Sequence, residues 1–541
     1  LVPDGDLLGT PALDPITAGT ELIDEARFIQ PDDSNLSDET VLSVPLPEAV
    51  APGETVTVEI DFVSTLPEIV ARTGWAASSS GEPFFMVAQW FPKLGVYEIP
   101  GQRYVPADAE TGRWSTHQFH ANSEFYADFG TYRVRMTVPA DYELGATGQQ
   151  VSAEGLGEQR AETYWAADVH DFAWTTGANL LVFEDQWEDV QLRLLMQPEH
   201  EAQAQRHFDA AKIALDRFDA WYGEYPYPTL TLVDGVGGSN GMEYPTLITC
   251  GTVYMLPEWA RPLELVTIHE FGHQYWYGLV ASNEAEEAWL DEGINSYSEV
   301  KVMEETYGRG SVIDFPGFKI SDSDFQRLSY TEQNPTRGAI YARSWDYTTR
   351  GDFGRNSYAK PATVLLTLEG LIGEDTMREI LRTYFERWRF NHPTTEDFKQ
   401  VVEEIAGDRV DVDRFFEQFI YGTVAVDYRL QQLSSQSSDL GGFTTVVRIH
   451  RMEQGVLPQT LRVRFADGHE ETRSWDGEAE WQTFTFRHGT QAIDAFIDPD
   501  DLIRMDLNRL NNRRAYDNAD AAETKYAFKL LVWIQQVLSL V

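Results

Sequence analysis

Two histidines four residues apart, with a glutamate directly after the first, constrain this chain more than any other feature of its sequence. They lie in the sequence HEFGH at positions 269–273, within an apolar run that follows Arg261-Pro262 and contains no further proline. Residues at i and i+4 of a helix lie one above the other on the same face. Two imidazole nitrogens in that arrangement can bind one tetrahedral zinc ion, while Glu270 is rotated off that face and can hold the metal's water. The pattern therefore predicts a buried helix that supplies two ligands of a zinc site.

A third ligand must come from another element, because two histidines do not complete such a site. Glu292 follows His273 after eighteen intervening residues and lies in the first turn of a second helical stretch, which opens at WLDEG. Glu299 lies seven residues further on and on the same face, where its carboxylate can accept a hydrogen bond from a ligand histidine. We expect His269, His273 and Glu292 to hold Zn²⁺, and Glu299 to orient one imidazole. The alternative interpretation is an ordinary buried helix that happens to carry two histidines.

This pattern resembles that of the gluzincin aminopeptidases, the family of aminopeptidase N and leukotriene hydrolase. Members of that family carry the same two-histidine motif, eighteen further residues, and then a glutamate within Trp-Leu-Asn-Glu-Gly. The present chain has Asp291 where the family usually has Asn, which we interpret as a small departure because that residue is not a ligand. The resemblance implies zinc-dependent removal of N-terminal residues from peptides, with Glu270 as the base that activates the water.

The resemblance extends to a glycine-rich stretch, GSNGMEYP at 238–245. It is similar to the family's Gly-x-Met-Glu-Asn motif, in which backbone pairs with the substrate and the glutamate binds the free α-amine. We therefore expect Gly241 and Met242 to line the substrate site and Glu243 to bind the ammonium group, since a carboxylate in a dry pocket selects a cation. Tyr244 replaces the usual Asn, so the shape of the first subsite does not follow from the motif. A glycine turn with an ordinary surface glutamate is the alternative.

Two further candidates come from the family context. Tyr358 precedes a helix that opens at Lys360-Pro361, where the family carries a tyrosine whose hydroxyl stabilises the oxyanion of the tetrahedral intermediate. Gln89 lies in VAQWFP, and the family places a glutamine from its first domain in the substrate cleft. The spacing from Gln89 to the Phe-Pro pair differs here, so a purely structural role is an equal alternative.

A second group of possible metal ligands lies near the entrance of a predicted strand: His117, His120, Glu124 and Asp128. Nothing in their spacing implies helical or ligand geometry. We expect these side chains to form local hydrogen bonds and not a second metal site.

The strand and helix patterns predict an α+β protein of several domains. Segments 55–62 and 132–139 alternate apolar and polar residues with period two, as half-buried strands do. From Glu199 the apolar spacing becomes helical, and it turns to a strand pattern again near Val426. Together with the resemblance, these patterns give four expected segments: an N-terminal β saddle domain with its opening strands missing (1–198), a thermolysin-like zinc catalytic domain (199–425), a β-sandwich (426–510), and a tail with an amphipathic helix (511–541).

The amino-acid composition limits which classes of molecule this chain can bind. The chain has 42 Lys and Arg against 87 Asp and Glu, a net charge of −45, and a negative field of this size argues against nucleic-acid binding. Acid-rich, lysine-poor surfaces resemble those of halophilic proteins. Cys250 is the only cysteine, so we expect no intrachain disulfide and a buried thiol. No apolar run reaches the roughly 18 residues needed to span a membrane. We expect the tail helix to pack on the protein, with membrane contact as the alternative, and we favour the cell envelope or the exterior over the cytoplasm.

Three alternatives to a zinc aminopeptidase stay open at this point. A thermolysin-type endopeptidase shares the zinc chemistry but does not need Glu243. A second activity on lipid epoxides, as in leukotriene hydrolase, cannot be inferred from these motifs. A non-enzymatic peptide-binding protein is the least favoured alternative, because such a protein would be expected to lose Glu270 or a ligand.

Overall fold

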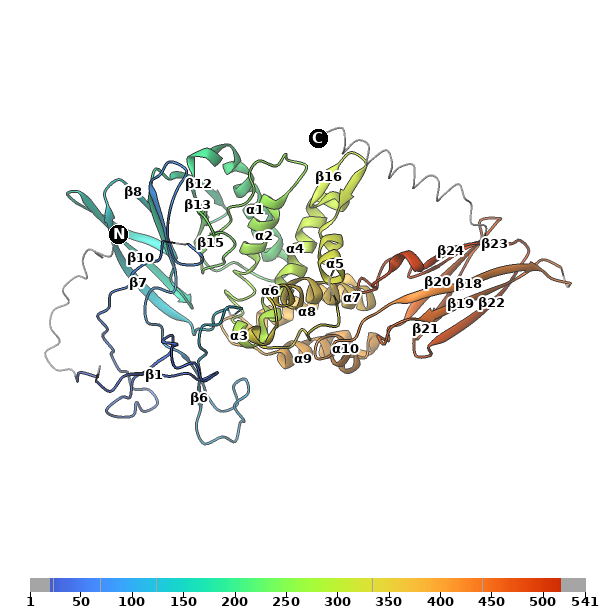
Figure 1. Ribbon diagram of the computed structural model, residues 1–541, viewed down its shortest axis with the longest axis horizontal. Coiled ribbons are helices and arrows are strands. Elements are labelled where there is room, and N and C mark those ends of the chain that lie inside the picture. Colours follow the sequence, from blue (N-terminus) through green and yellow to red (C-terminus); the bar gives the residue numbers. More distant parts are fainter. Residues whose placement is uncertain are drawn as a thin grey trace. The chain divides into compact units, whose positions relative to one another are not determined.

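The computed structural model describes residues 20–22, 24–68, 70–122, 124–332, 334–439 and 441–516 (Figure 1). The chain divides into two compact units. The first contains the described residues up to 332 together with 338–365 and 372–412, and the second contains 334–337, 366–371 and the described residues from 413.

The first unit opens with a β region that consists mainly of two antiparallel sheets. One sheet has the order β3-β4-β11-β8, formed by Gly74–Ala77, Pro83–Val87, Trp174–Ala178 and Tyr142–Ala146. The other has the order β7-β10-β9, formed by Gly130–Pro139, Gln159–Val169 and Gln149–Leu156. Phe85, Leu144 and Phe172 are among the buried side chains of its core. Two short pairs complete the region: β1 (Arg27–Phe28) with β2 (Leu42–Ser43), and β5 (Val96–Glu98) with β6 (Arg113–Ser115).

One of the two predicted strands forms and the other does not. Segment 132–139 lies within β7, as expected, whereas 55–62 belongs to no strand. The apolar side chains of this second segment are about half exposed, with Val56 at 50%, Val58 at 56% and Ile60 at 49%. Alternation stabilises a strand only where a neighbour satisfies its backbone groups, and the described residues contain no such partner for 55–62. The prediction of a strand there was wrong.

A mixed sheet joins the β region to the helices that follow. Its order is β12-β13-β14-β15, formed by Leu181–Trp187, Val190–Met196, Thr229–Val233 and Leu247–Thr249. The first pair is antiparallel and the other two pairs are parallel. Cys250 follows β15 and is fully buried, as expected, and burial raises the pKa of its thiol.

Three neighbouring helices carry the centre of the first unit: α1 (Ala204–Trp221), α2 (Pro262–Gly272) and α4 (Glu292–Tyr307) (Figure 1). Gly272 lies where they meet, because a Cβ atom there would lie 2.8 Å from Cζ of Phe218 on α1 and would collide with Asn295 on α4. The Asn295 amide donates to the carbonyl oxygen of His269 at 2.8 Å. The glycine of the HEFGH sequence thus allows the close packing that brings α4 to α2.

The other helices are α3 (Glu284–Glu287), α5 (Asp322–Thr331), α6 (Arg350–Gly354), a π-helical turn (Arg355–Ala359), α7 (Lys360–Ile372), α8 (Glu374–Trp388) and α9 (Thr395–Ala406). Short 3₁₀ turns cover Pro198–Gln203, Ala288–Leu290, Gly308–Gly310, Ser344–Asp346 and Gly407–Arg409, and β16 (Ile313–Phe315) pairs with β17 (Phe318–Ile320).

The second unit contains nearly all of α10 (Val412–Phe419) and, after it, a β-sandwich. One antiparallel sheet has the order β18-β19-β22, formed by Tyr428–Ser437, Phe443–Arg451 and Trp481–His488. The other has the order β21-β20-β23-β24, formed by Glu470–Trp475, Gln459–Phe465, Ala492–Ile497 and Arg513–Ala515. A 3₁₀ turn, Arg509–Asn511, precedes β24.

The limits of this second unit differ from the expected segments. It begins at Asp413, ahead of Val426. Strand β24 lies within the expected tail, 511–541, and pairs with β23, so the sheet extends past Leu510. The amphipathic helix expected further along the tail lies outside the described residues. In the part of the chain that is described, no helix combines the length and hydropathy of a membrane span.

Candidate metal centre and active site

Three side-chain donors converge between α2 and α4. Nε2 of His269 lies 3.1 Å from Nε2 of His273, and Oε2 of Glu292 lies 3.4 Å from the first nitrogen and 3.1 Å from the second. Four-residue spacing on α2 brings the two rings together, and the first turn of α4 supplies the carboxylate. The two histidines and the glutamate that the sequence singled out therefore meet at one point.

The geometry of these donors fits a tetrahedral metal ion. Bonds of about 2.0–2.1 Å in a tetrahedral site separate the ligand atoms by about 3.3 Å, close to the three separations found here. Oε2 of Glu292 is buried and has no hydrogen-bond partner within the described residues; it faces the two ring nitrogens. Two imidazoles and one carboxylate are a donor set that leaves one position open for a fourth ligand.

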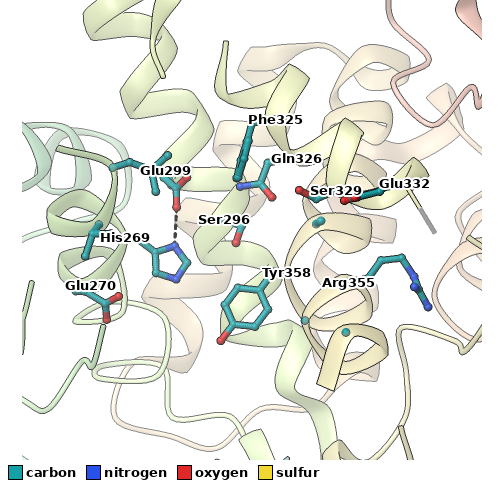
Figure 2. Close-up of a pocket in the computed structure, with 15 residues that line it drawn as sticks. His269, Glu270, Ser296, Glu299, Phe325, Gln326, Ser329, Glu332, Arg355 and Tyr358 are labelled. Atoms are coloured by element: carbon teal, nitrogen blue, oxygen red, sulfur yellow. Dashed lines mark hydrogen bonds and ion pairs between the residues drawn. The ribbon is translucent and has the colours of Figure 1, made fainter. Parts of the chain in front are cut away.

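Each imidazole is held from behind by a carboxylate. Oε2 of Glu299 lies 2.6 Å from Nδ1 of His269 (Figure 2), as the sequence led us to expect. Oδ1 of Asp291 lies 2.5 Å from Nδ1 of His273. Sequence reasoning treated Asp291 as a minor departure and missed this contact. The signal that could have revealed it is its position directly before Glu292, which places a second carboxylate near the same pair of rings.

The carboxylates determine the protonation of the ligand histidines. Burial alone would lower the pKa of His269, but the carboxylates of Glu292 and Glu299 outweigh burial and raise the pKa to about 10. Burial would likewise lower the pKa of His273, but Asp291 and Glu292 raise it well above its usual range. Burial would raise the pKa of Glu292, but the two imidazoles hold it well below its usual range. A divalent cation that displaces the imidazole protons would neutralise the negative charge of the same carboxylates.

Glu270 lies beside the donors but is not one of them. Its side chain is buried, and its Oε1 lies 3.6 Å from the point where a Cβ atom of Gly241 would stand. Gly241 has φ +77°, a conformation that favours glycine. Burial, opposed by the imidazole of His269, raises the pKa of Glu270 to about 8. The glycine-rich stretch therefore approaches this carboxylate directly.

Glu243 lies at the edge of the same group of charges. It is buried, and one of its carboxylate oxygens lies within 4.8 Å of donor atoms of His273, Asp291 and Glu292. The backbone of Met242 forms an antiparallel bridge with Thr249, which fixes the stretch against the end of β15. The structure thus brings Gly241, Met242 and Glu243 next to the metal donors.

Tyr358 also contacts the donors. Its hydroxyl donates a hydrogen bond to Oε1 of Glu292, and its ring stacks on that of His269 with centroids 6.0 Å apart (Figure 2). The residue lies in the π-helical turn before α7, and single π turns are frequent at functional sites. Burial and the nearby Glu292 raise the pKa of Tyr358 well above its usual range, so the hydroxyl keeps its proton.

Gln89 and the second group of possible metal ligands form contacts away from the three converging donors. Gln89 has φ +51°, and its amide donates to Asp171 within the β region. The four residues of the second group form separate contacts: His117 and His120 with Asp32 (2.8 and 3.1 Å), Glu124 with Arg72 (2.7 Å), and Asp128 with His392 (3.3 Å). The two histidines share Asp32, but the four side chains do not meet at one point; they form hydrogen bonds as expected, although their partners are distant in sequence and not local.

One of these contacts involves residues that sequence reasoning missed. Arg72 of the β region pairs with buried Glu124, and its Nη1 lies 2.6 Å from Sδ of Met242. Burial raises the pKa of Glu124 to about 8, although Arg72 opposes this shift. No local sequence pattern identifies the contact of Arg72 with Met242, because the two residues lie 170 positions apart in the sequence.

Comparisons with known proteins relate part of this chain to a peptidase family. Residues 206–419 match the family model described as the peptidase family M1 domain. Relatives include aminopeptidase M1-D of Oryza sativa subsp. japonica, 25% identical over 195 residues (34% of this chain, 22% of the relative), and human glutamyl aminopeptidase, 23% identical over 304 residues (51% and 30%). Leukotriene A-4 hydrolase of Xenopus laevis is 26% identical over 178 residues (32% and 28%). The matches to these curated relatives thus span less than a third of their length.

A solved structure shares the fold. It is the crystal structure of Legionella pneumophila aminopeptidase A in complex with aspartic acid, with a TM-score of 0.56 and 15% identity over 82% of this chain and 49% of that chain. The expected α+β class, with several domains and a β region ahead of the helical one, is confirmed. Residues 206–419 therefore match the domain of peptidase family M1, and the solved structure supports the shared fold.

Proposed function

We propose that this protein is a zinc-dependent aminopeptidase that removes N-terminal residues from peptides with a free α-amine. The observation that carries the proposal is the convergence of His269, His273 and Glu292, with donor separations of 3.1 to 3.4 Å. His269, His273 and Glu292 would hold zinc, and Asp291 and Glu299 would fix the two rings. When bound, zinc supplies Lewis-acid polarisation of the scissile carbonyl and lowers the pKa of a water molecule.

Glu270 is the proposed general base. Its carboxylate lies beside the donors without being one of them, so it is available to take a proton from the attacking water and to return it to the leaving amine nitrogen. Tyr358 keeps its proton because of burial. Its hydroxyl can therefore donate a hydrogen bond to the carbonyl oxygen as negative charge develops on that atom.

Glu243 supports cleavage at the N-terminus in preference to internal bonds. The buried carboxylate of Glu243 lies close to the metal donors and can form a charge-assisted hydrogen bond with an α-ammonium group. A peptide bound in this way would place its first carbonyl group at the metal donors. Gly241 and Met242 would line the path of the substrate backbone. An internal peptide segment, as in a thermolysin-type endopeptidase, offers no cation to Glu243.

A substrate panel tests this proposal. We expect the zinc-loaded protein to hydrolyse aminoacyl p-nitroanilides but not their N-acetylated forms, and a chelator to abolish turnover until zinc is restored. Glu243→Gln should lower kcat/KM for free-amine substrates by at least about tenfold, since a charge-assisted contact is lost. Glu258→Gln, in an exposed loop, is the matched control. Turnover confined to acetylated substrates, or turnover that resists the chelator, would refute the proposal.

A further inference from the structure

A cavity of about 390 Å³ opens beside the proposed catalytic residues, with His269, Glu270 and Tyr358 in its wall. Figure 2 shows Phe325, Gln326, Ser329 and Glu332 in a row along another side. The row belongs to α5 and the residue that follows it. A volume of this size lies within the range of small-ligand sites.

The position of the cavity indicates which residue of a bound peptide would enter it. Glu243, the proposed ammonium partner, is not among its lining residues, whereas Glu270 and Tyr358 are. A peptide held with its α-ammonium group at Glu243 and its first carbonyl at the metal donors therefore directs the leaving side of the scissile bond toward this cavity. The side chain that would enter it is that of the second residue of the peptide. This step rests on the proposed function.

The wall combines apolar and polar surfaces. Leu265, Val266 and Phe325 provide apolar contacts, and Ser296 and Gln326 provide hydrogen-bonding groups. Phe325 is 46% exposed, so its ring is available to a bound chain. A long side chain with a methylene stem and a polar end fits such a wall better than a short or fully apolar one, because the stem packs while the end stays solvated.

The charges of the wall favour a cation at the outer end. Glu299 is bound to His269 at 2.6 Å, and Arg355 is paired with Asp352 at 2.8 Å, both partners being 2% exposed. Glu332 differs, because its carboxylate has no ion-pair partner in the described part of the chain. Its backbone N–H caps α5 by donating to the carbonyl of Leu328 at 2.8 Å. The C-terminal end of a helix adds partial negative charge at the same place.

We propose that this cavity receives the side chain of the second peptide residue and selects arginine or lysine there. The aliphatic stem packs along Leu265, Val266 and Phe325, and the cation pairs with Glu332 at the end of α5. An exposed ion pair of this kind changes a rate or an affinity by about three- to tenfold, so the selection is a preference and not an absolute requirement.

A peptide series tests the preference. Peptides Ala-Xaa-Gly-Gly with Arg, Lys, Gln, Met, Glu or Gly as Xaa are incubated with the zinc-loaded full chain, and release of alanine gives kcat/KM. We expect Arg and Lys to exceed Gln and Met by about three- to tenfold. Glu332→Gln should bring the four values together, and Glu332→Lys should make Glu the better charged residue. Phe325→Ala should lower the values for Arg and Met alike relative to Gly.

Controls separate this inference from the proposed function. Alanine p-nitroanilide has an uncharged leaving group, so its turnover by Glu332→Gln shows that the variant is folded and zinc-loaded while the preference for Arg and Lys is lost. Glu305→Gln on α4, which is paired with Arg217 and does not line the cavity, should leave the whole series unchanged. If neither anilide nor peptide is cleaved by the wild type, the proposed function fails. If both are cleaved but Arg, Lys, Gln and Met are equivalent, or Glu is fastest, the inference alone is overturned.

Discussion

Asp291 and His273 form a hydrogen-bonded pair directly behind the metal donors, with 2.5 Å between Oδ1 and Nδ1. The pair mirrors that of Glu299 and His269, at 2.6 Å. One carboxylate precedes Glu292 and the other follows it by two helical turns, so the same segment of chain supplies a donor and the partners of both rings. Such contacts fix the tautomer and the orientation of a ligand histidine and commonly carry a 10- to 100-fold effect on metal affinity.

Removing this carboxylate should weaken metal binding. Asp291→Ala is expected to lower zinc affinity about 10- to 100-fold, because Nδ1 of His273 loses its acceptor. Asp291→Asn keeps an acceptor oxygen and should lose less. Affinity is measured by competition with a chelating dye, with Glu258→Gln as the control in an exposed loop. Unchanged affinity in the alanine variant would show that the contact does not orient the ring.

Glu270→Gln should separate catalysis from metal binding. The amide cannot accept a proton from water, so kcat should fall by about 10²- to 10⁴-fold. Zinc content should stay at one per chain, because Glu270 is not among the converging donors. Turnover and metal content are measured on the same preparation. A variant that has lost its zinc, or that turns over at the wild-type rate, would exclude the role of general base.

Short-range patterns predicted the centre of this site well. The four-residue spacing of His269 and His273 depends only on helix geometry: α2 covers Pro262–Gly272, and His273 is its C-cap residue, which keeps helical backbone angles. Glu299 follows from the same periodicity along α4. Each spacing lies within one helical stretch, so local sequence is sufficient to predict which side chains share a face, although the contact of Glu299 with His269 joins α4 to α2.

Contacts between distant segments could not be predicted in the same way. Arg72 meets Met242 across 170 positions, and Gln89 turns to Asp171 across 82. Segment 55–62 shows the converse, since its alternation is that of a strand but no strand lies beside it in the described chain. A sequence pattern predicts which secondary structure a segment can adopt, whereas the neighbouring segments determine whether it adopts that structure.

Tyr358→Phe tests the proposed oxyanion contact. Loss of the hydroxyl should lower kcat by about 10²- to 10³-fold while KM changes much less, because the hydrogen bond strengthens as charge develops in the transition state. Tyr341→Phe is a matched control, since that tyrosine is exposed and does not line the cavity. Steady-state kinetics and thermal midpoints are compared for both variants. A rise in KM with constant kcat would indicate a role in substrate binding alone.

His207 should make the first unit sensitive to acid. It bridges α1 and α2, with Nδ1 2.9 Å from Oγ1 of Thr267 and Nε2 3.1 Å from the hydroxyl of Tyr254. The Thr267 hydroxyl donates to the carbonyl of Leu263 at 2.8 Å, so its oxygen accepts from Nδ1–H. Burial lowers the pKa of His207 from 6.5 to about 3.

The sign of the pH effect follows from this shift. Between pH 6.5 and 3, His207 binds a proton in the unfolded chain but not in the folded one. The contribution of neutral His207 to the free energy of unfolding is therefore complete above pH 6.5 and is lost as the pH falls toward 3. Its upper limit is about 5 kcal/mol. His207→Asn keeps a donor toward Thr267 but does not titrate, so its free energy of unfolding should fall less than that of the wild type between pH 7.5 and 5. Denaturant titrations on metal-free protein measure the difference, and parallel pH dependences would show that His207 does not cause the acid sensitivity.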